Sequence, residues 1–132
     1  MIARILVGTP SSSHAGAALE AAAELASTYD AELIVLQVEP IIDARRVFDP
    51  DGVPEAPDHS LLLRRSYPGL RVRSHLARGN PARAMCEVAT QEHTDLIVIQ
   101  QGRRGNGGNM LSHRASGALA QIAPCPVLLV AS

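Results

Sequence analysis

Apolar residues along this chain fall into short continuous runs, separated by longer stretches in which they recur every three or four positions. Continuous aliphatic runs bounded by polar or turn-forming residues indicate buried strands. Such runs lie at residues 96–99 and 127–130, and at 2–7 and 33–38, where one polar residue interrupts each. Residues 70–77 instead alternate apolar side chains with arginine and histidine. This period of two predicts a strand that is exposed on one face, near a sheet edge.

The segments between these strands carry the spacing of amphipathic helices. Apolar positions trace one helical face over residues 14–29, and a less regular pattern predicts a short helix over residues 60–67. Asn80 followed by Pro81 is typical of a helix start, because asparagine caps the first turn and proline needs no hydrogen-bond partner there. A last apolar stripe over residues 111–122 predicts one more helix.

The order of these elements favours a single α/β domain over residues 1–132. Apolar strands alternating with helices indicate a parallel sheet covered on both faces, and right-handed crossovers make it a doubly wound, five-stranded sheet. Ligands bind such sheets at the carboxyl ends of the strands, where the strand order reverses. The connections over residues 8–13 and 102–109 are therefore expected to meet there. Residues 39–59 hold four prolines and no periodic pattern, which predicts a long connection.

Composition narrows the classes of function. The formal net charge is −1, and the chain holds one Phe, two Tyr and no Trp. Nucleic acid is not expected as a partner, because a basic surface and stacking platforms are both missing. The chain has no lysine, which excludes a P-loop lysine and a Schiff base. No apolar run reaches membrane-spanning length and the start does not fit a signal peptide, so we expect a cytosolic protein with no membrane partner.

The reactive side chains lack the spacing of catalytic or metal sites. Cys86 and Cys125 form no CxxC pair and are expected to be buried free thiols, with a disulfide between them as the alternative. The histidines share no metal-ligand spacing, and the stretch Asp49-Pro50-Asp51-Gly52 lacks the later ligands of a calcium loop. Ser11-Ser12-Ser13 is better explained by helix capping than by nucleophilic catalysis. No catalytic or metal-binding residue is therefore assigned.

A glycine-rich stretch, Gly102 to Gly108, directly follows the fourth predicted strand and precedes the last predicted helix. Glycines let successive backbone N–H groups converge on an anion, and a helix start adds partial positive charge. Strand, glycine loop and helix in this order therefore predict a phosphate or nucleotide site, with a merely flexible connection as the alternative. Arg103 and Arg104 would either contact phosphate or lie in solvent.

Segments spread over nearly the whole chain resemble the universal stress protein family. They are Ile5-Leu6-Val7, Gly79-Asn80-Pro81-Ala82, Asp95-Leu96-Ile97-Val98 and the stretch from Ala123 to Val130. The resemblance implies an adenine nucleotide alpha hydrolase-like fold with strand order 3-2-1-4-5.

The family's nucleotide motif, G-x2-G-x9-G-[S/T], is matched at three of its four positions. Gly102 and Gly105 occupy the first two positions. Ala115 stands where the third glycine is expected, and Ser116 fills the last position. The resemblance implies that backbone amides at Gly102, Gly105 and nearby Gly107 hold phosphates. The Ser116 hydroxyl would add a further donor.

The resemblance also implies where the nucleoside part of the ligand would lie. Val38 would meet adenine through its main chain. Gly8, Thr9 and Ser12 would lie beside the ligand. In nucleotide-binding members an aspartate after the first strand holds the ribose, and Pro10 stands at that position here. Proline has neither a carboxylate nor an N–H group, so the ribose half of the site is altered while the phosphate half is kept.

The function implied by the resemblance is ligand-dependent signalling or stress response, with ATP or another adenine nucleotide as ligand and Mg²⁺ accompanying its phosphates. A partner-binding module with a degenerate nucleotide site is the alternative. A nucleotide hydrolase ranks last, because no supported general base is visible near the glycine stretch. In the family the last strand lies at a sheet edge, which predicts a homodimer through that strand. Its residues are Val127, Leu128, Leu129 and Val130.

Overall fold

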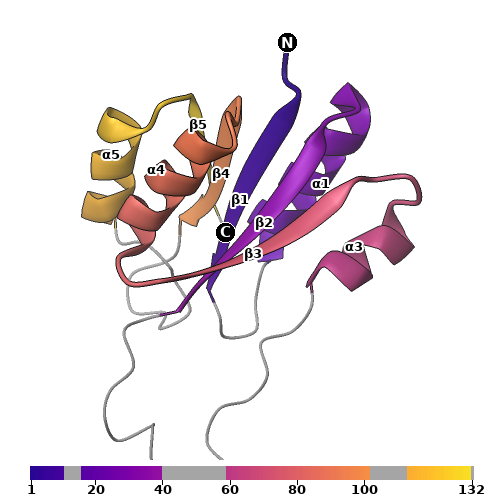
Figure 1. Cartoon of the computed structure of the whole chain (residues 1–132), viewed down its shortest axis with the longest axis horizontal. Helices are drawn as coiled ribbons and strands as arrows, with labels where there is room; N and C mark the ends of the chain where they lie inside the picture. The colour runs from indigo at the N-terminus through magenta and orange to yellow at the C-terminus, as the bar shows by residue number, and fades with distance from the viewer. Residues whose placement is uncertain (11–15, 40–58, 102–112, 132) are drawn as a thin grey trace, which may run out of the picture.

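The computed structural model describes residues 1–10, 16–39, 59–101 and 113–131, in which strands and helices alternate (Figure 1). The strands are β1 (Arg4–Pro10), β2 (Glu32–Glu39), β3 (Val72–Arg78), β4 (Leu96–Gln101) and β5 (Val127–Ala131). The helices are α1 (Gly16–Tyr29), α3 (His59–Ser66), α4 (Pro81–Gln91) and α5 (His113–Ile122). Every strand and helix expected from the sequence is present within these ranges.

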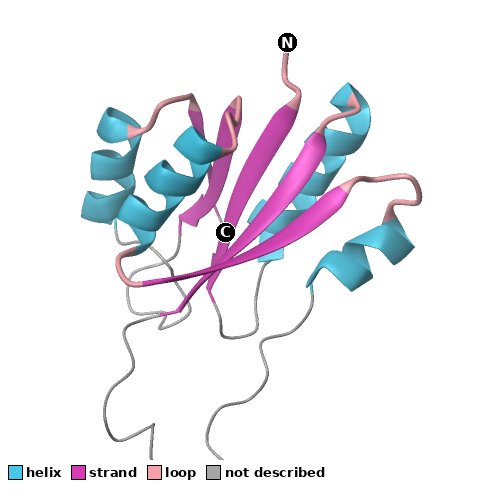
Figure 2. Ribbon diagram, in the orientation of Figure 1, coloured by secondary structure: helices cyan, strands magenta, loops and turns pink. Residues whose placement is uncertain are grey.

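The strands form one parallel sheet in the order β3-β2-β1-β4-β5. This order confirms the doubly wound fold, with β1 in the centre and β3 and β5 at the two edges. Helices α1 and α3 cover one face of the sheet, and α4 and α5 cover the other (Figure 2). Strand β3 lies at an edge of the sheet, as the pattern of residues 70–77 predicts. The expected exposure of one face only is wrong, because Val72 is buried but Leu76, on the same apolar face, is 53% exposed.

The sheet separates two hydrophobic cores. On one face α1 buries four alanines and one leucine against the strands, and these small side chains let the helix lie close to the sheet. On the other face Met85 of α4 and Leu119 of α5 are fully buried against the same sheet. Successive residues of a strand point to opposite faces, so Ile5 enters the first core and Leu6 the second.

Strand β1 extends further than the sequence pattern predicts. We expected it to end at Val7, but it continues through Gly8 and Thr9 to Pro10, which pairs with Val38 of β2. Proline is tolerated because β1 pairs with β4 only as far as Val7, so beyond that residue it has a neighbour on one side only. Gly8, Thr9 and Pro10 therefore belong to the sheet rather than to the connection that follows it.

Candidate functional site

Strands β1 and β4 stop pairing before either strand ends. Their last paired residues are Val7 and Val98, although the strands run on to Pro10 and Gln101. Each of the two strands stays paired with its other neighbour. Strand β1 pairs with β2 as far as Pro10, and β4 pairs with β5 as far as Gln101. The sheet thus divides at its carboxyl end between β1 and β4 (Figure 1). This is the point at which the strand order reverses, where doubly wound sheets bind ligands.

Several residues of the predicted site belong to the ends of β1 and β2. Those that the structure describes lie together at this carboxyl end. Thr9 is fully buried, and its Oγ1 donates a hydrogen bond of 3.4 Å to the Leu36 carbonyl oxygen. Val38 is also buried and pairs with Pro10 on one side and with Ala77 on the other. Because β2 ends one residue later, the Val38 main chain lies at the carboxyl end of the sheet, and the resemblance implies that it contacts adenine there.

Gln100 of β4 is a polar residue at this end that the sequence argument missed. Its Oε1 is buried and has no hydrogen-bond partner. Val98, two residues earlier on the same strand, belongs to the core under α1, so Gln100 points to the α1 face as well. The signal in the sequence is a polar residue that ends an apolar strand at a position pointing toward a core.

The first residue of α1 explains how the Gln100 carboxamide fits. Gly16 has φ +43°, and a Cβ atom placed on it would lie 2.7 Å from Gln100 Oε1. A side chain at position 16 would therefore be strained and would displace the carboxamide. Glycine at this position lets α1 begin directly against the end of β4.

Ser116 is the second residue at this end with an unpartnered polar atom. It is the fourth residue of α5, is 1% exposed, and its Oγ has no hydrogen-bond partner. Helix α5 follows β4 along the chain, so its start lies at the carboxyl end of the sheet. Within the described ranges, Gln100 Oε1 and Ser116 Oγ are the buried side-chain polar atoms that lack a partner. Such atoms are rare in folded proteins because each costs about 1–3 kcal/mol.

Other residues of the predicted site fall outside the described residues. They are Ser12, Gly102, Gly105 and Gly107, together with the arginines at 103 and 104. For Pro10 and Ala115 only the backbone is described, at the end of β1 and near the start of α5. The structure therefore brings together Gly8, Thr9, Pro10 and Val38, and places Ser116 after the fourth strand.

Two other kinds of site, a metal centre and an activated thiol, can be checked among the described residues. They hold no group of three or more His, Cys, Asp or Glu side chains suited to a metal ion. Cys86 and Cys125 are free, half-buried thiols, and burial is the main cause that raises the pKa of each. Both are therefore protonated at neutral pH and weakly nucleophilic. No described helix is long and apolar enough to cross a lipid bilayer.

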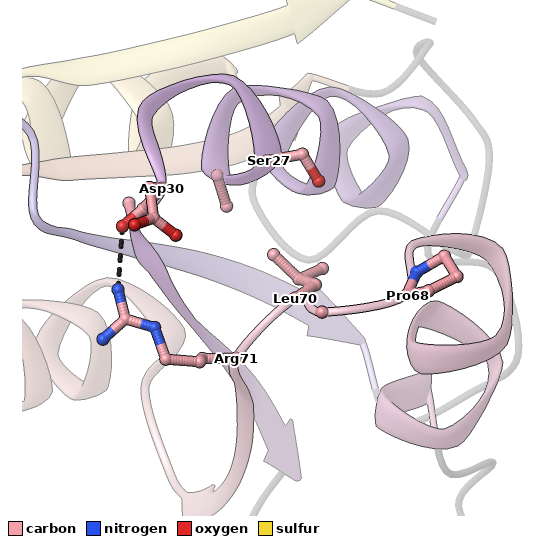
Figure 3. Close-up of a pocket in the computed structure, with 8 residues that line it drawn as sticks. Ser27, Asp30, Pro68, Leu70 and Arg71 are labelled. Carbon is pink, nitrogen blue, oxygen red and sulfur yellow. Dashed lines mark hydrogen bonds between the residues drawn. The ribbon is translucent and has the colours of Figure 1, made fainter.

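A pocket of about 190 Å³ lies at the opposite, amino end of the sheet (Figure 3). It lies between the end of α1 and the turn that leads from α3 to β3, near Asp30, Pro68 and Arg71. The Arg71 guanidinium donates a hydrogen bond of 2.7 Å to the Asp30 carbonyl oxygen. That bond satisfies the end of α1, so the arginine has a structural role here.

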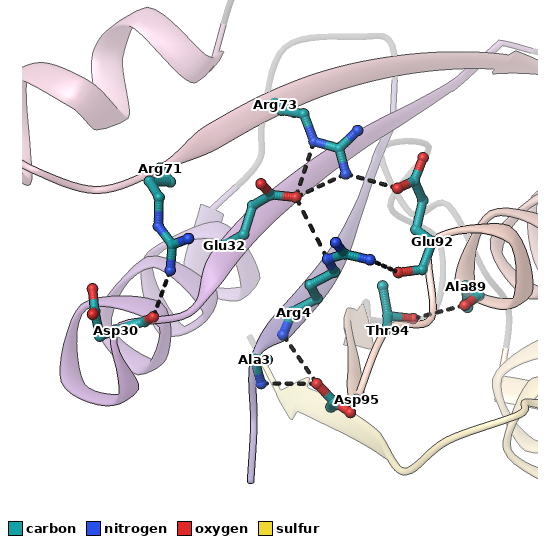
Figure 4. Close-up of polar contacts among 10 residues, drawn as sticks. All are labelled: Ala3, Arg4, Asp30, Glu32, Arg71, Arg73, Ala89, Glu92, Thr94 and Asp95. Carbon is teal, nitrogen blue, oxygen red and sulfur yellow. Dashed lines mark hydrogen bonds and ion pairs between the residues drawn. The ribbon is translucent and has the colours of Figure 1, made fainter.

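The amino ends of the strands are joined by a network of paired charges (Figure 4). Asp95 Oδ2 accepts hydrogen bonds from the backbone amides of Ala3 and Arg4 at 2.8 and 3.1 Å, and these bonds lower the pKa of Asp95. The Arg73 guanidinium donates to Glu32 and Glu92 at 2.7 Å each. The bond to Arg73 lowers the pKa of Glu92, and both bonds raise the pKa of Arg73. These charges satisfy one another and leave no free group for a ligand among the residues of this network.

Comparison with known proteins places this chain in one family. A model described as the universal stress protein family matches residues 1–131. A universal stress protein of Thermus aquaticus, from the 3′ region of a QAH/OAS sulfhydrylase, is 32% identical over 98% of this chain and 99% of its own length.

Solved structures agree on the fold. A universal stress protein in complex with cAMP superposes with a TM-score of 0.70 at 20% identity, covering 98% of this chain and 97% of its own. A universal stress protein family member from Arabidopsis thaliana with AMP bound gives a TM-score of 0.63 at 18% identity, with 98% and 91% covered. At these identities the likeness concerns the fold alone. Because the family model spans nearly every residue, this chain belongs to the universal stress protein family.

Proposed function

We propose that residues 1–132 act as one universal stress protein domain that binds an adenine nucleotide at the carboxyl end of its sheet. Binding of the nucleotide would regulate a signalling or stress-response role in the cytosol, without catalysis. The observation that carries the proposal is that the carboxyl end of the sheet, where β1 and β4 stop pairing, holds two buried atoms without partners: Gln100 Oε1 on β4 and Ser116 Oγ near the start of α5. A ligand with donors and acceptors would satisfy both. Structural neighbours with cAMP or AMP bound support an adenine nucleotide as that ligand.

The ligand's three parts would meet different segments of this end. Adenine would contact the main chain of Val38, at the end of β2. The phosphates would be held by backbone amides at Gly102, Gly105 and Gly107, which lie outside the described residues, and Mg²⁺ would accompany them. The Ser116 hydroxyl, already buried and unpartnered, would donate to a phosphate oxygen.

The ribose contact is expected to be the weak part of this site. Pro10 offers no carboxylate, and a hydrogen bond to a charged group contributes about 1.5–3 kcal/mol. Its absence would weaken binding by roughly ten- to 150-fold relative to a site with an aspartate. Phosphate contacts would then carry most of the affinity, so ATP would bind more tightly than adenosine.

Isothermal titration calorimetry with ATP, ADP, AMP and adenosine tests this proposal on the wild type, Pro10→Asp and Pro10→Ala. We expect affinity to fall from ATP to adenosine, and Pro10→Asp to bind more tightly than either other protein. A gain in both variants would assign the limitation to proline's rigidity rather than to the missing carboxylate. If neither the wild type nor Pro10→Asp binds any of the four ligands, the site is degenerate and the chain acts through protein partners.

We also propose that two copies pair through β5. Leu128 and Leu129 on this edge strand are 38% and 39% exposed, and an unpaired apolar edge strand favours pairing with a second copy. Leu129→Glu should shift the protein from dimer to monomer in light scattering at micromolar concentration. Leu76→Glu, on the other edge strand and 53% exposed, is the matched control and should leave the dimer intact. Equal effects of the two substitutions would count against β5 as the interface.

A further inference from the structure

We infer that the Gln100 carboxamide recognises the ribose of the bound nucleotide, with its Oε1 accepting a hydrogen bond from a ribose hydroxyl. This inference rests on the proposed nucleotide function and adds a residue to it. It gives a role to a buried polar atom for which the fold itself supplies no partner.

The position of Gln100 on the sheet fits this role. Val98 pairs with Val7, so Gln100 stands level with Thr9, two residues further along each strand. Here β1 and β4 no longer pair, and Gln100 lies on the β4 side of their separation. The proposed adenine contact at Val38 lies to one side of this point, and the connection that would hold the phosphates leaves β4 directly after Gln101. The ribose joins those two parts of the ligand and would therefore pass Gln100.

The chemistry of the carboxamide also fits a sugar hydroxyl. An amide oxygen accepts hydrogen bonds, and a ribose hydroxyl can donate one. The residue is neutral, so it adds no repulsion toward phosphates. Pro10, at the end of the neighbouring strand, lacks any side-chain acceptor. Gln100 would thus supply from β4 an acceptor that β1 does not provide.

The carboxamide already lies buried at this point without a ligand. Gly16, the first residue of α1, leaves room for it: a Cβ there would lie 2.7 Å from Oε1 and 3.3 Å from Nε2. An acceptor that is already buried and positioned loses little conformational entropy on binding. Its unpartnered state disfavours the empty site, and a ligand hydroxyl would relieve that cost.

The test compares ATP with 2′-deoxy-ATP and 3′-deoxy-ATP by calorimetry on four proteins: wild type, Gln100→Met, Gln100→Glu and Gln121→Met. Methionine matches the size of glutamine but has no strong acceptor, and glutamate keeps an acceptor. Gln121 is exposed on α5, so Gln121→Met controls for the substitution itself. We expect the wild type and Gln121→Met to bind one of the two deoxynucleotides about tenfold more weakly than ATP.

In Gln100→Met, ATP should bind about tenfold more weakly and the difference between ATP and its deoxy analogues should disappear. Gln100→Glu should bind all three more weakly, because its charge repels phosphates, yet still distinguish them. Without ligand, Gln100→Met should melt at the same temperature as the wild type or higher, since it removes an unpartnered buried atom.

The outcomes that would contradict the ribose role differ from those that would contradict nucleotide binding. If the wild type binds ATP but Gln100→Met keeps both its affinity and its discrimination, the ribose role is wrong and nucleotide binding stands. A lower melting temperature for Gln100→Met, with unchanged discrimination, would make Gln100 a structural residue. If the wild type binds no adenine nucleotide, the proposed function and the ribose role fall together.

Discussion

The amino and carboxyl ends of this sheet treat their polar groups in opposite ways. At the amino end, the carboxylates of Glu32, Glu92 and Asp95 accept hydrogen bonds from arginine side chains or backbone amides (Figure 4). At the carboxyl end, Gln100 Oε1 and Ser116 Oγ are buried and have no partner. The amino end also holds β1 and β4 together through the Asp95 contacts, whereas at the carboxyl end the two strands separate.

This difference suggests that the amino end stabilises the fold and that the carboxyl end binds the ligand. Buried polar groups without partners destabilise a fold, so they persist where another requirement maintains them. That requirement is usually function, because natural proteins depart from local structural rules mainly at their functional sites. Substitutions at the amino end should therefore change stability alone, and matched substitutions at the carboxyl end should change ligand binding.

Two glycines with positive φ give the largest expected effect. Gly16 (φ +43°) begins α1 beside Gln100, and Gly69 (φ +89°) lies in the turn before β3, where an added Cβ atom would have nothing within 4 Å. Replacing either glycine by alanine forces a side chain into a left-handed backbone conformation, at about 1–2 kcal/mol. Urea unfolding should show a loss of this size for both variants.

Nucleotide binding should separate the two glycine variants. Gly16→Ala displaces the Gln100 carboxamide and should weaken ATP binding by about tenfold, while Gly69→Ala should bind ATP as the wild type does. Gly117→Ala is the control for alanine itself, because Gly117 lies within α5 with open space around it, and alanine favours helices there. Equal ATP affinities for Gly16→Ala and Gly69→Ala would contradict the assignment of ligand binding to the carboxyl end alone.

The strands and helices could be predicted almost completely from the sequence, because their signals are local and repeated, whereas the order of the strands was predicted from the family resemblance. The aliphatic runs at residues 33–38 and 96–99 and the Asn80-Pro81 helix start each correspond to an observed element. The error at the end of β1 has a tertiary cause. Gly8, Thr9 and Pro10 are weak strand formers as a group, and only pairing with β2 keeps them in the sheet.

The site could be predicted only in part. The family motif pointed to Ser116 and the wider resemblance to Val38, and both lie at the carboxyl end of the sheet. Gln100 escaped notice because its one sequence signal, a polar residue in phase with the core-facing Val98, does not by itself distinguish a buried glutamine from an exposed one. Its significance comes from the separation of β1 and β4 and from the contact with Gly16, which is 84 positions away in the sequence. Such information exists only once the chain has folded.

Two buried hydroxyls provide the next comparison. Ser116 Oγ at the carboxyl end has no partner, whereas Thr94 Oγ1 near the amino end donates to the Ala89 carbonyl oxygen at 3.4 Å. Ser116→Ala should leave the free energy of unfolding unchanged or raise it, and should weaken ATP binding by about tenfold. Thr94→Val should lower the free energy of unfolding by about 1 kcal/mol and leave binding unchanged. A destabilised Ser116→Ala would mean that its hydroxyl supports the fold instead.

Asp95 at the amino end predicts a pH dependence of stability. Its pKa is lowered by hydrogen bonds from the backbone amides of Ala3 and Arg4, so the folded state favours the charged form. The stabilisation is fully present above the ordinary aspartate pKa and disappears as the pH falls through the lowered one. Asp95→Asn should lower the free energy of unfolding by about 1 kcal/mol at pH 7. This is less than the loss of a fully buried hydrogen bond to a charged group, because water reaches the site. The difference from wild type should shrink as the pH falls below about 4, and a constant difference would contradict the assignment.

Substitution of Arg73 should have the smallest effect on stability, and it tests the charged network at the amino end most directly. Its guanidinium bridges Glu32 and Glu92 across two strands and the end of α4, but its side chain is 48% exposed. Exposed ion pairs contribute little and are screened by salt, so Arg73→Met should lower the melting temperature by about 2 °C at low ionic strength. In 1 M NaCl this difference should nearly vanish, since the Debye length falls to about 3 Å.

Arg83→Met is the matched control for Arg73→Met. Arg83 pairs with Glu87 within α4 alone, at 3.3 Å, and is 82% exposed. Its substitution should change the melting temperature less than that of Arg73, because it joins no separate elements. ATP affinity should be unchanged in both variants. A loss of ATP affinity in Arg73→Met would show that the charged network at the amino end influences the carboxyl end through β1 and β4, and the two ends would then have to be treated as one coupled unit.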